Sequence, residues 1–114
     1  MTFFRLVLII LFAALLIYTL MVGAEHGWNL APPFVAEIQA MTWQGQFNFD
    51  FAGFLFLSAT WCVWRNDFSP LGWGLAVLGA TGGILFLSVY LLILSFKTGG
   101  DVKTMLIGVR RAQA

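Results

Sequence analysis

Four side chains that could carry chemistry, three carboxylates and an imidazole, lie in the first half of the chain. They are Glu25, His26, Glu37 and Asp50. Such groups can bind a divalent metal, relay protons, or act as general acid and base. Glu25 and His26 are adjacent, however, so they diverge on a helix, and no H-x-x-E, H-E-x-x-H or D-x-D pattern accompanies them. The group therefore fits a polar connection at a membrane interface, and it predicts no metal site and no cofactor.

Asp50 is the one carboxylate that lies inside a hydrophobic run, at the start of a helix predicted over residues 47–64. A carboxylate at membrane depth costs roughly 2.5 to 3.5 kcal/mol on insertion scales and indicates a function. Two interpretations remain open. If Asn48 caps the helix, Asp50 lies in its first turn, about 4 to 5 Å deep, where free N–H groups favour an anion. Alternatively, Asp50 faces a binding pocket together with Gln46 and Gly53.

A ligand site at this position would combine polar and aromatic side chains near the membrane interface. Its candidate residues are Glu37, Trp43, Gln46, Asn48, Asp50 and Phe54. A lipid, an isoprenoid or a similar apolar molecule would lie among the phenylalanines, with its polar end near Asp50. A membrane enzyme that uses Asp50 and Glu37 on lipid-like substrates is a weaker hypothesis, because no catalytic motif is present.

Composition predicts an integral membrane protein. Of the 114 residues, 61% are hydrophobic and only 10% are charged, whereas about a quarter of a soluble domain is charged. The length allows one small bundle and no second domain. A net charge of +1 gives no basic field for nucleic acid. The single cysteine, Cys62, cannot form an internal disulfide and is expected to be a buried apolar side chain.

Three hydrophobic segments predict three membrane-spanning helices, over about residues 4–22, 47–64 and 71–96. The first reaches roughly 20 residues, or about 30 Å, with its flanking phenylalanines. It also fits a signal peptide, with a cleavage pattern at Val22-Gly23-Ala24. The second is barely long enough to cross a bilayer, and the third is long enough to tilt.

Two further helices are expected at the membrane surface. Pro33 suits the first turn of a short amphipathic helix over about residues 33–43, and Trp43 suits the headgroup belt. Thr98-Gly99-Gly100 ends the third predicted span. The basic tail, residues 97–114, then forms either a second surface helix or a partly ordered end.

Small residues recur at four-residue spacing along the third predicted span, which lets a neighbouring backbone approach closely. They are Gly72, Ala76, Gly79, Ala80 and Gly83. Glycine is also common in membrane helices without such a role. The sequence leaves open whether the packing partner is the second span or another chain.

The basic residues give a divided signal for orientation. Three spans would place Arg5 and Arg65 on one side of the membrane and the four cations of the tail on the other. The connection between the first two spans has no Lys or Arg, which favours an amino terminus inside the cell. The tail favours the reverse, and a third interpretation is insertion in both orientations.

The order of these parts resembles that of small uncharacterised three-span membrane proteins of bacteria, with relatives in plants. The features that carry the resemblance are Glu37, Asn48-Phe49-Asp50, Trp64-Arg65-Asn66-Asp67 and the charged segment from Lys97 onward. The resemblance implies the three-span topology and a bacterial inner-membrane location. It implies no activity, and the tail after Gly100 is the part that matches the pattern least.

These observations predict an all-α bundle of three transmembrane helices, with a short interfacial helix between the first and second. The favoured function is non-enzymatic. The protein would be a structural or accessory component that packs through its glycine face, either with itself or with a larger membrane complex. A ligand-binding or transport-linked role around Asp50 is the alternative.

Overall fold

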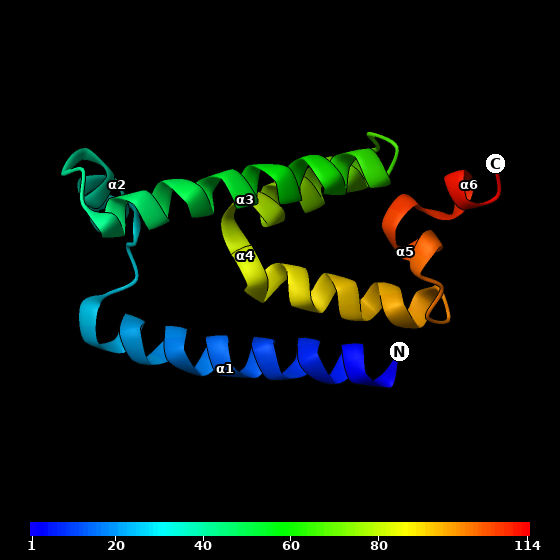
Figure 1. Ribbon diagram of the computed structural model, residues 1–114, viewed down its shortest axis with the longest axis horizontal. Helices are drawn as coiled ribbons and strands as arrows, with labels where there is room; N and C mark the ends of the chain where they lie inside the picture. The colour runs from blue at the N-terminus through cyan, green and yellow to red at the C-terminus, as the bar shows by residue number, and fades with distance from the viewer.

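The computed structural model describes all 114 residues and is entirely helical, with 83% helix and no strands. Its helices are α1 (Thr2–His26), α2 (Ala31–Gln39), α3 (Trp43–Arg65), α4 (Pro70–Lys97), α5 (Val102–Ile107) and α6 (Val109–Ala112). In Figure 1, α1 and α3 form the bottom and top of the molecule, and part of α4 lies between them. The prediction of an all-α fold is therefore confirmed.

Two of the helices, α1 and α4, are long and apolar enough to cross a membrane. Helix α3 has 23 residues, but its first turns carry Gln44, Gln46, Asn48 and Asp50, which lower its hydropathy. The predicted segments 4–22, 47–64 and 71–96 are thus all helical, whereas only two of the three helices meet the criterion for a membrane crossing.

Helix α3 begins earlier than predicted, and its cap is Thr42 rather than Asn48. The Thr42 hydroxyl accepts a hydrogen bond from the backbone N–H of Gly45 at 3.0 Å, as an N-cap residue does. Asn48 instead donates its side-chain amide to the carbonyl oxygen of Phe34 at 3.1 Å and so ties α3 to α2. Asp50 consequently lies in the third turn, about 10 Å from the helix start, and the first-turn interpretation is wrong.

Helix α4 reverses direction at Gly83, whose φ of 55° and ψ of −138° are outside the helical region. In a continuous helix, Gly72 and Tyr90 would be separated by about 27 Å, yet both contact Asn66. A Cβ built on Gly72 lies 3.0 Å from Asn66 Cβ, and the Asn66 amide donates to the Tyr90 hydroxyl at 2.9 Å. The second half of α4 therefore runs back toward the end of the molecule at which α4 begins (Figure 1).

The two halves of α4, residues 70–82 and 84–97, are each about 20 Å long. The first half lies along α3, and the second half lies between α3 and α1 (Figure 1). The prediction of a single continuous helix over 71–96 is wrong for this reason. Gly83 was predicted to be a packing residue, but it forms the turn, a conformation that glycine adopts without steric cost.

The other small residues of α4 pack within the chain. Gly72, Ala76 and Gly79 are buried on the face of α4 that lies against α3. A Cβ on Gly79 would lie 3.3 Å from the Ser58 hydroxyl oxygen, so larger side chains would separate the helices. Ala80 is exposed. The partner of the small-residue face is therefore α3 of the same chain, which leaves that face unavailable to a second protein.

The tail forms α5 and α6 and docks on the end of α3. Trp61 Nε1 donates to the carbonyl oxygen of Leu106 at 2.8 Å, and Arg65 Nε donates to that of Met105 at 2.5 Å. Met105 joins a small buried cluster with Cys62, Tyr90 and Leu94. These bonds satisfy carbonyl groups at the end of α5 that have no partner within so short a helix.

Candidate functional site

The residues predicted to form a ligand site are not gathered around one cavity. Glu37 accepts a hydrogen bond from the Thr42 hydroxyl at 2.8 Å and so belongs to the corner between α2 and α3. Trp43 and Phe54 point outward, with 80% and 66% of their surfaces exposed. A shallow pocket of about 220 Å³ lies at this corner, and Gln46 is the only predicted ligand residue that lines it.

Asp50 is an exposed carboxylate with neither an ion pair nor a side-chain hydrogen bond. It lies on the side of α3 that faces away from α4, together with other exposed residues at helical spacing. We call this surface the Asp50 face; it consists of Gln46, Asp50, Gly53, Leu57 and Thr60. A Cβ built on Gly53 meets nothing within 4 Å, so the face is open at its centre.

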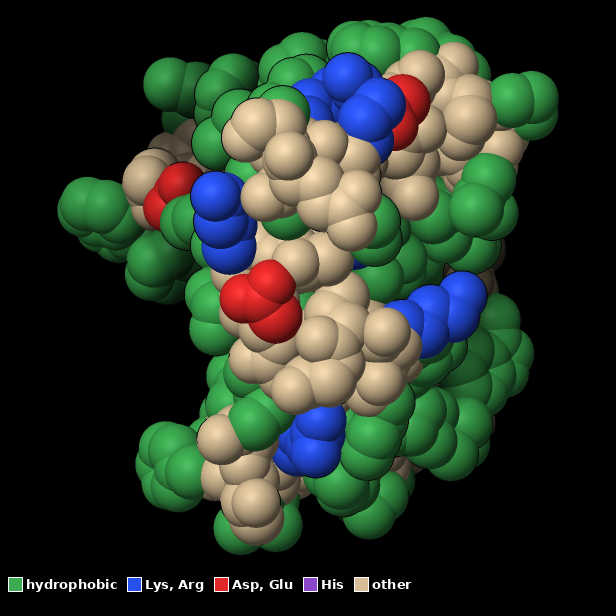
Figure 2. Space-filling view, turned by 90° about the vertical axis from the view of Figure 1, so that its right-hand side faces the viewer, with side chains coloured by type: hydrophobic (Ala, Val, Ile, Leu, Met, Phe, Trp, Pro, Cys, Tyr) green, Lys and Arg blue, Asp and Glu red, His purple; other side chains and the backbone are tan.

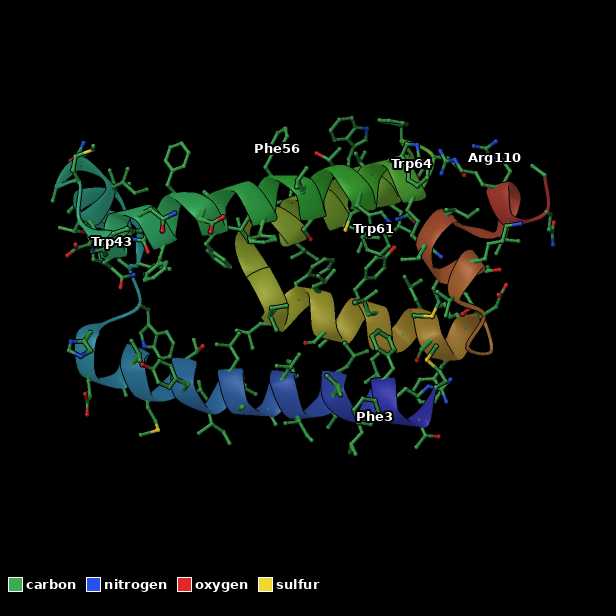
Figure 3. All side chains as sticks on the ribbon, viewed as in Figure 1. Phe3, Trp43, Phe56, Trp61, Trp64 and Arg110 are labelled. Atoms are coloured by element: carbon green, nitrogen blue, oxygen red, sulfur yellow. The ribbon has the colours of Figure 1, made fainter.

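Large aromatic side chains flank the Asp50 face on both sides. Phe56 extends from α3 away from the rest of the molecule (Figure 3), with 70% of its surface exposed, and Phe49 and Phe54 are similarly exposed. The Asp50 face is therefore a strip that holds polar and small residues together with Leu57, between aromatic rims, and nothing in the chain covers it.

Glu25 and His26 lie at the end of α1 and do not join Glu37 or Asp50 in an interacting cluster. His26 Nε2 is 3.8 Å from Glu25 Oε2, and both side chains are more than 70% exposed. No group of three or more His, Cys, Asp and Glu side chains is arranged to share a metal ion. These residues have the geometry of a solvated connection.

All six Lys and Arg residues lie at the opposite end of the molecule, because α4 returns to the end where it starts. Figure 2 looks onto this end and shows the basic side chains spread over it. Arg5, at the start of α1, donates to the hydroxyl and carbonyl oxygens of Ser95 at 3.0 and 2.9 Å. Its guanidinium also lies 4.1 Å from the centre of the Phe96 ring. Arg5 thus joins α1 to the end of α4.

Asp67 holds the last helix to the turn between α3 and α4. Its carboxylate lies 2.6 Å from Arg110 Nη2 and 3.2 Å from Arg111 Nη2. The hydrogen bond from Arg110 and the nearby positive charges hold the pKa of Asp67 below its ordinary value. Arg111 also lies over the Trp64 ring, 4.0 Å from its centre, so α6 is fixed by charge and by stacking.

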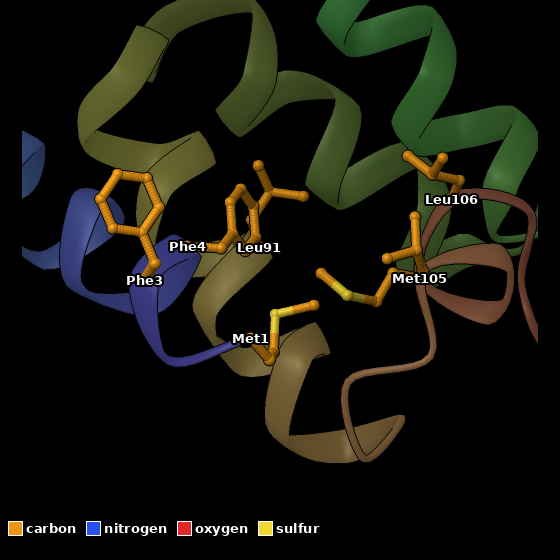
Figure 4. Close-up of a pocket in the computed structure, with 7 residues that line it drawn as sticks. Met1, Phe3, Phe4, Leu91, Met105 and Leu106 are labelled. Carbon is orange, nitrogen blue, oxygen red and sulfur yellow. The ribbon is translucent and has the colours of Figure 1, made fainter.

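An apolar pocket of about 630 Å³ opens at the same end, between the start of α1, the second half of α4 and α5 (Figure 4). We call it the amino-terminal pocket. Its lining is entirely hydrophobic: Met1, Phe3, Phe4, Leu91, Val102, Met105 and Leu106. Sequence reasoning missed it, although the helical spacing of Val102, Met105 and Leu106 was visible. The pocket requires α4 to fold back, which that spacing does not reveal.

The geometry of both ends can be compared with known proteins. No protein-family model, curated protein or solved structure matches this chain. The functional interpretation therefore depends on the residues and contacts of the chain itself.

Proposed function

We propose that this chain is an integral membrane protein that binds a helix of another membrane protein through the Asp50 face. Membrane location is supported first by exposed apolar surface. Only 14 of 114 residues are buried, and just 11% of the residues in the most apolar stretch of α1 are buried. The core helix of a soluble protein would be largely covered, whereas a lipid-facing helix has no need to be.

The total surface area supports the same location. The accessible surface is 7915 Å², whereas a soluble monomer of 12.7 kDa would expose about 6,200 Å². The excess is consistent with helices whose apolar sides face lipid. In water, so much exposed Leu, Ile and Phe surface would cause aggregation.

The proposed arrangement has two spans, α1 and α3, although α3 does not reach the hydropathy of α1 and α4. Helix α4 has the total length and hydropathy of a crossing helix, but its reversal at Gly83 makes it a hairpin that enters and leaves from one side. Trp43 and Trp64 lie at opposite ends of α3 (Figure 3), about 31 Å apart along the helix, which equals the thickness of the hydrocarbon region. Tryptophan favours both interfaces. Each half of α4 is about 20 Å long and too short to cross.

The distribution of charge supports an orientation. With α4 as a hairpin, all six Lys and Arg residues lie on one side and none on the other. The positive-inside rule then favours both termini in the cytoplasm. In a bacterial inner membrane, the location implied by the sequence resemblance, α2 would lie at the outer surface.

Asp50 is the observation that carries the partner-binding function. It lies about 10 Å from the start of α3, hence inside the hydrocarbon region, on the lipid-facing side. A carboxylate there is costly unless a partner supplies charge or hydrogen bonds. A second copy of this chain in the same orientation would place carboxylate against carboxylate. The complementary partner is instead a membrane helix of another protein that offers Lys, Arg or a hydrogen-bond donor at this depth.

A photo-cross-linking amino acid at position 53 tests this function in intact membranes, with Gly74 as the matched control position because it too meets nothing within 4 Å. The residue at position 53 is expected to cross-link one membrane protein, through a segment with a basic or donor side chain. The residue at position 74 should not.

Asp50→Asn should reduce the position 53 product at least several-fold, because it removes the charge, while Glu25→Gln removes an exposed charge elsewhere and should leave the product unchanged. A cross-linked dimer of this chain, or a product insensitive to Asp50→Asn, would contradict the proposed function.

A further inference from the structure

The amino-terminal pocket differs from the Asp50 face in its chemistry and in its place in the molecule. It lies at the basic end, and three segments distant in sequence build it (Figure 4). Its volume of about 630 Å³ is within the usual range of roughly 300–1,000 Å³ for small-molecule sites. Phe3, on its rim, is 79% exposed. The hydrophobic lining therefore suits an apolar chain, and the exposure of Phe3 shows that the pocket is open to the surface of the molecule.

The basic residues around this pocket divide into two groups. All four arginines have protein partners: Arg5 binds Ser95, Arg65 binds the end of α5, and Arg110 and Arg111 bind Asp67. Lys97 and Lys103 are exposed and have neither an ion pair nor a side-chain hydrogen bond. The two lysines are thus the basic side chains that remain free for a ligand.

The two lysines lie in the segment that ends α4 and begins α5, and α5 contributes lining residues to the pocket. Lys97 is the last residue of α4, and Lys103 follows the lining residue Val102 in the first turn of α5. The turn that joins them contacts the pocket rim, since a Cβ on Gly100 would lie 3.2 Å from Met1 Cγ. Asp101, which lies between the two lysines in the sequence, accepts a hydrogen bond from the Thr104 hydroxyl.

We infer that the amino-terminal pocket binds one anionic phospholipid, with an acyl chain among its hydrophobic residues and the phosphate near Lys97 and Lys103. The inference depends on the membrane location proposed above but not on a partner at Asp50. In the proposed orientation this end faces the cytoplasmic leaflet, which carries anionic lipid and attracts basic residues near its surface. An amphiphile with one apolar chain and one anionic group matches both features.

Native mass spectrometry of the delipidated full-length protein in detergent tests the inference. The protein is titrated separately with four ligands: phosphatidylglycerol, phosphatidylcholine that has the same acyl chains, oleate, and glycerol phosphate. One phosphatidylglycerol should bind per chain, about tenfold more tightly than phosphatidylcholine, because two lysines favour the anion. Glycerol phosphate, which has no acyl chain, should not bind. Equal affinity for both phospholipids, tighter binding of oleate than of phosphatidylglycerol, or binding of glycerol phosphate would overturn the inference.

Matched variants locate the site. Leu106→Trp fills the pocket and should weaken phosphatidylglycerol binding about tenfold, whereas Val109→Trp places the same large side chain at an exposed position outside the pocket and should not. Lys97→Gln with Lys103→Gln should abolish the preference for the anionic lipid. Gln113→Glu, the control, also makes the net charge more negative, but at a position in the tail, and it should preserve the preference for the anionic lipid. If Leu106→Trp lowers helicity, the Lys97→Gln, Lys103→Gln double variant alone tests the inference. An unchanged preference for phosphatidylglycerol in the double variant then refutes it.

Discussion

Two glycines of α3 show how one residue type serves opposite purposes on one helix. A Cβ built on Gly45 would overlap the carbonyl oxygen of Glu37, so α2 can lie against α3 only because position 45 has no side chain. Gly53 meets nothing within 4 Å and lies at the centre of the Asp50 face. Gly45 is therefore required by the fold of the isolated chain, whereas Gly53 is not.

Gly45→Ala should destabilise the protein by about 1 to 3 kcal/mol, because backbone atoms of α2 must move to admit the methyl group. Gly53→Ala, the control, should be neutral or stabilising by up to about 1 kcal/mol, since alanine favours the helix. Thermal unfolding in detergent, followed by circular dichroism, measures both. Equal stability of the two variants would show that α2 does not pack on Gly45.

The sequence identified the correct kind of residue at the start of α3 but the wrong position. Thr42 and Asn48 are both good N-caps, and Asn48 was favoured because the hydrophobic run begins beside it. Gln44 and Gln46 are tolerated within the helix because they are exposed. Hydropathy cannot separate a polar first turn from a polar connection, so the distance of Asp50 from the start of α3 was underestimated.

At the scale of elements, the positions of the helices were predictable and the path of the chain was not. Each long hydrophobic segment of the sequence is helical, and Thr98 and the two glycines after it end α4 as expected. The reversal at Gly83 was missed because hydropathy and helical period carry no information about direction. Only Gly82-Gly83, a pair of weak helix formers, marked the place.

The docking of α6 should depend on Asp67 and on pH. Because the Arg110 hydrogen bond lowers the pKa of Asp67, this carboxylate stabilises the docked tail above its ordinary pKa of about 3.9. The stabilisation is lost as pH falls through the lowered value. Hydrogen exchange of residues 108–114 should therefore be slow at pH 7 and should rise in Asp67→Asn at the same pH, after correction for intrinsic rates.

Acidification below the lowered pKa should bring the wild-type tail to the exchange level of Asp67→Asn. Asp50→Asn, which changes a carboxylate far from the tail, is the control and should leave these amides unaffected. Unchanged protection in Asp67→Asn would show that Trp64, Arg65 and Met105 hold the tail without the ion pairs.

At the scale of the whole molecule, the fold-back of α4 changes the charge argument. The sequence predicts a divided orientation signal because three continuous spans would separate Arg5 and Arg65 from the tail. With both ends of α4 beside Arg65, the same six cations form one group. The proposed arrangement keeps the individual charges and differs from the sequence-based argument only in the number of crossings.

Labelling of single cysteines with a membrane-impermeant maleimide tests this topology in a Cys62→Ala background. Phe68→Cys in the turn before α4 and Gln113→Cys in the tail should react from the same, cytoplasmic side. Gln39→Cys in α2 should react only from the other side. Reaction of positions 68 and 113 from opposite sides would instead support three continuous crossings.

The hairpin of α4 also gives the protein an uneven cross-section. Each half extends about 20 Å from the basic end and turns beside Phe51 and Leu55. In the proposed orientation, four helical segments occupy the cytoplasmic leaflet, whereas only α1 and α3 pass through the depth nearest the outer surface. The protein thus displaces more lipid from the inner leaflet than from the outer one. A crowded patch of such proteins would make the bilayer bulge toward the cytoplasm, with the inner leaflet on the convex side.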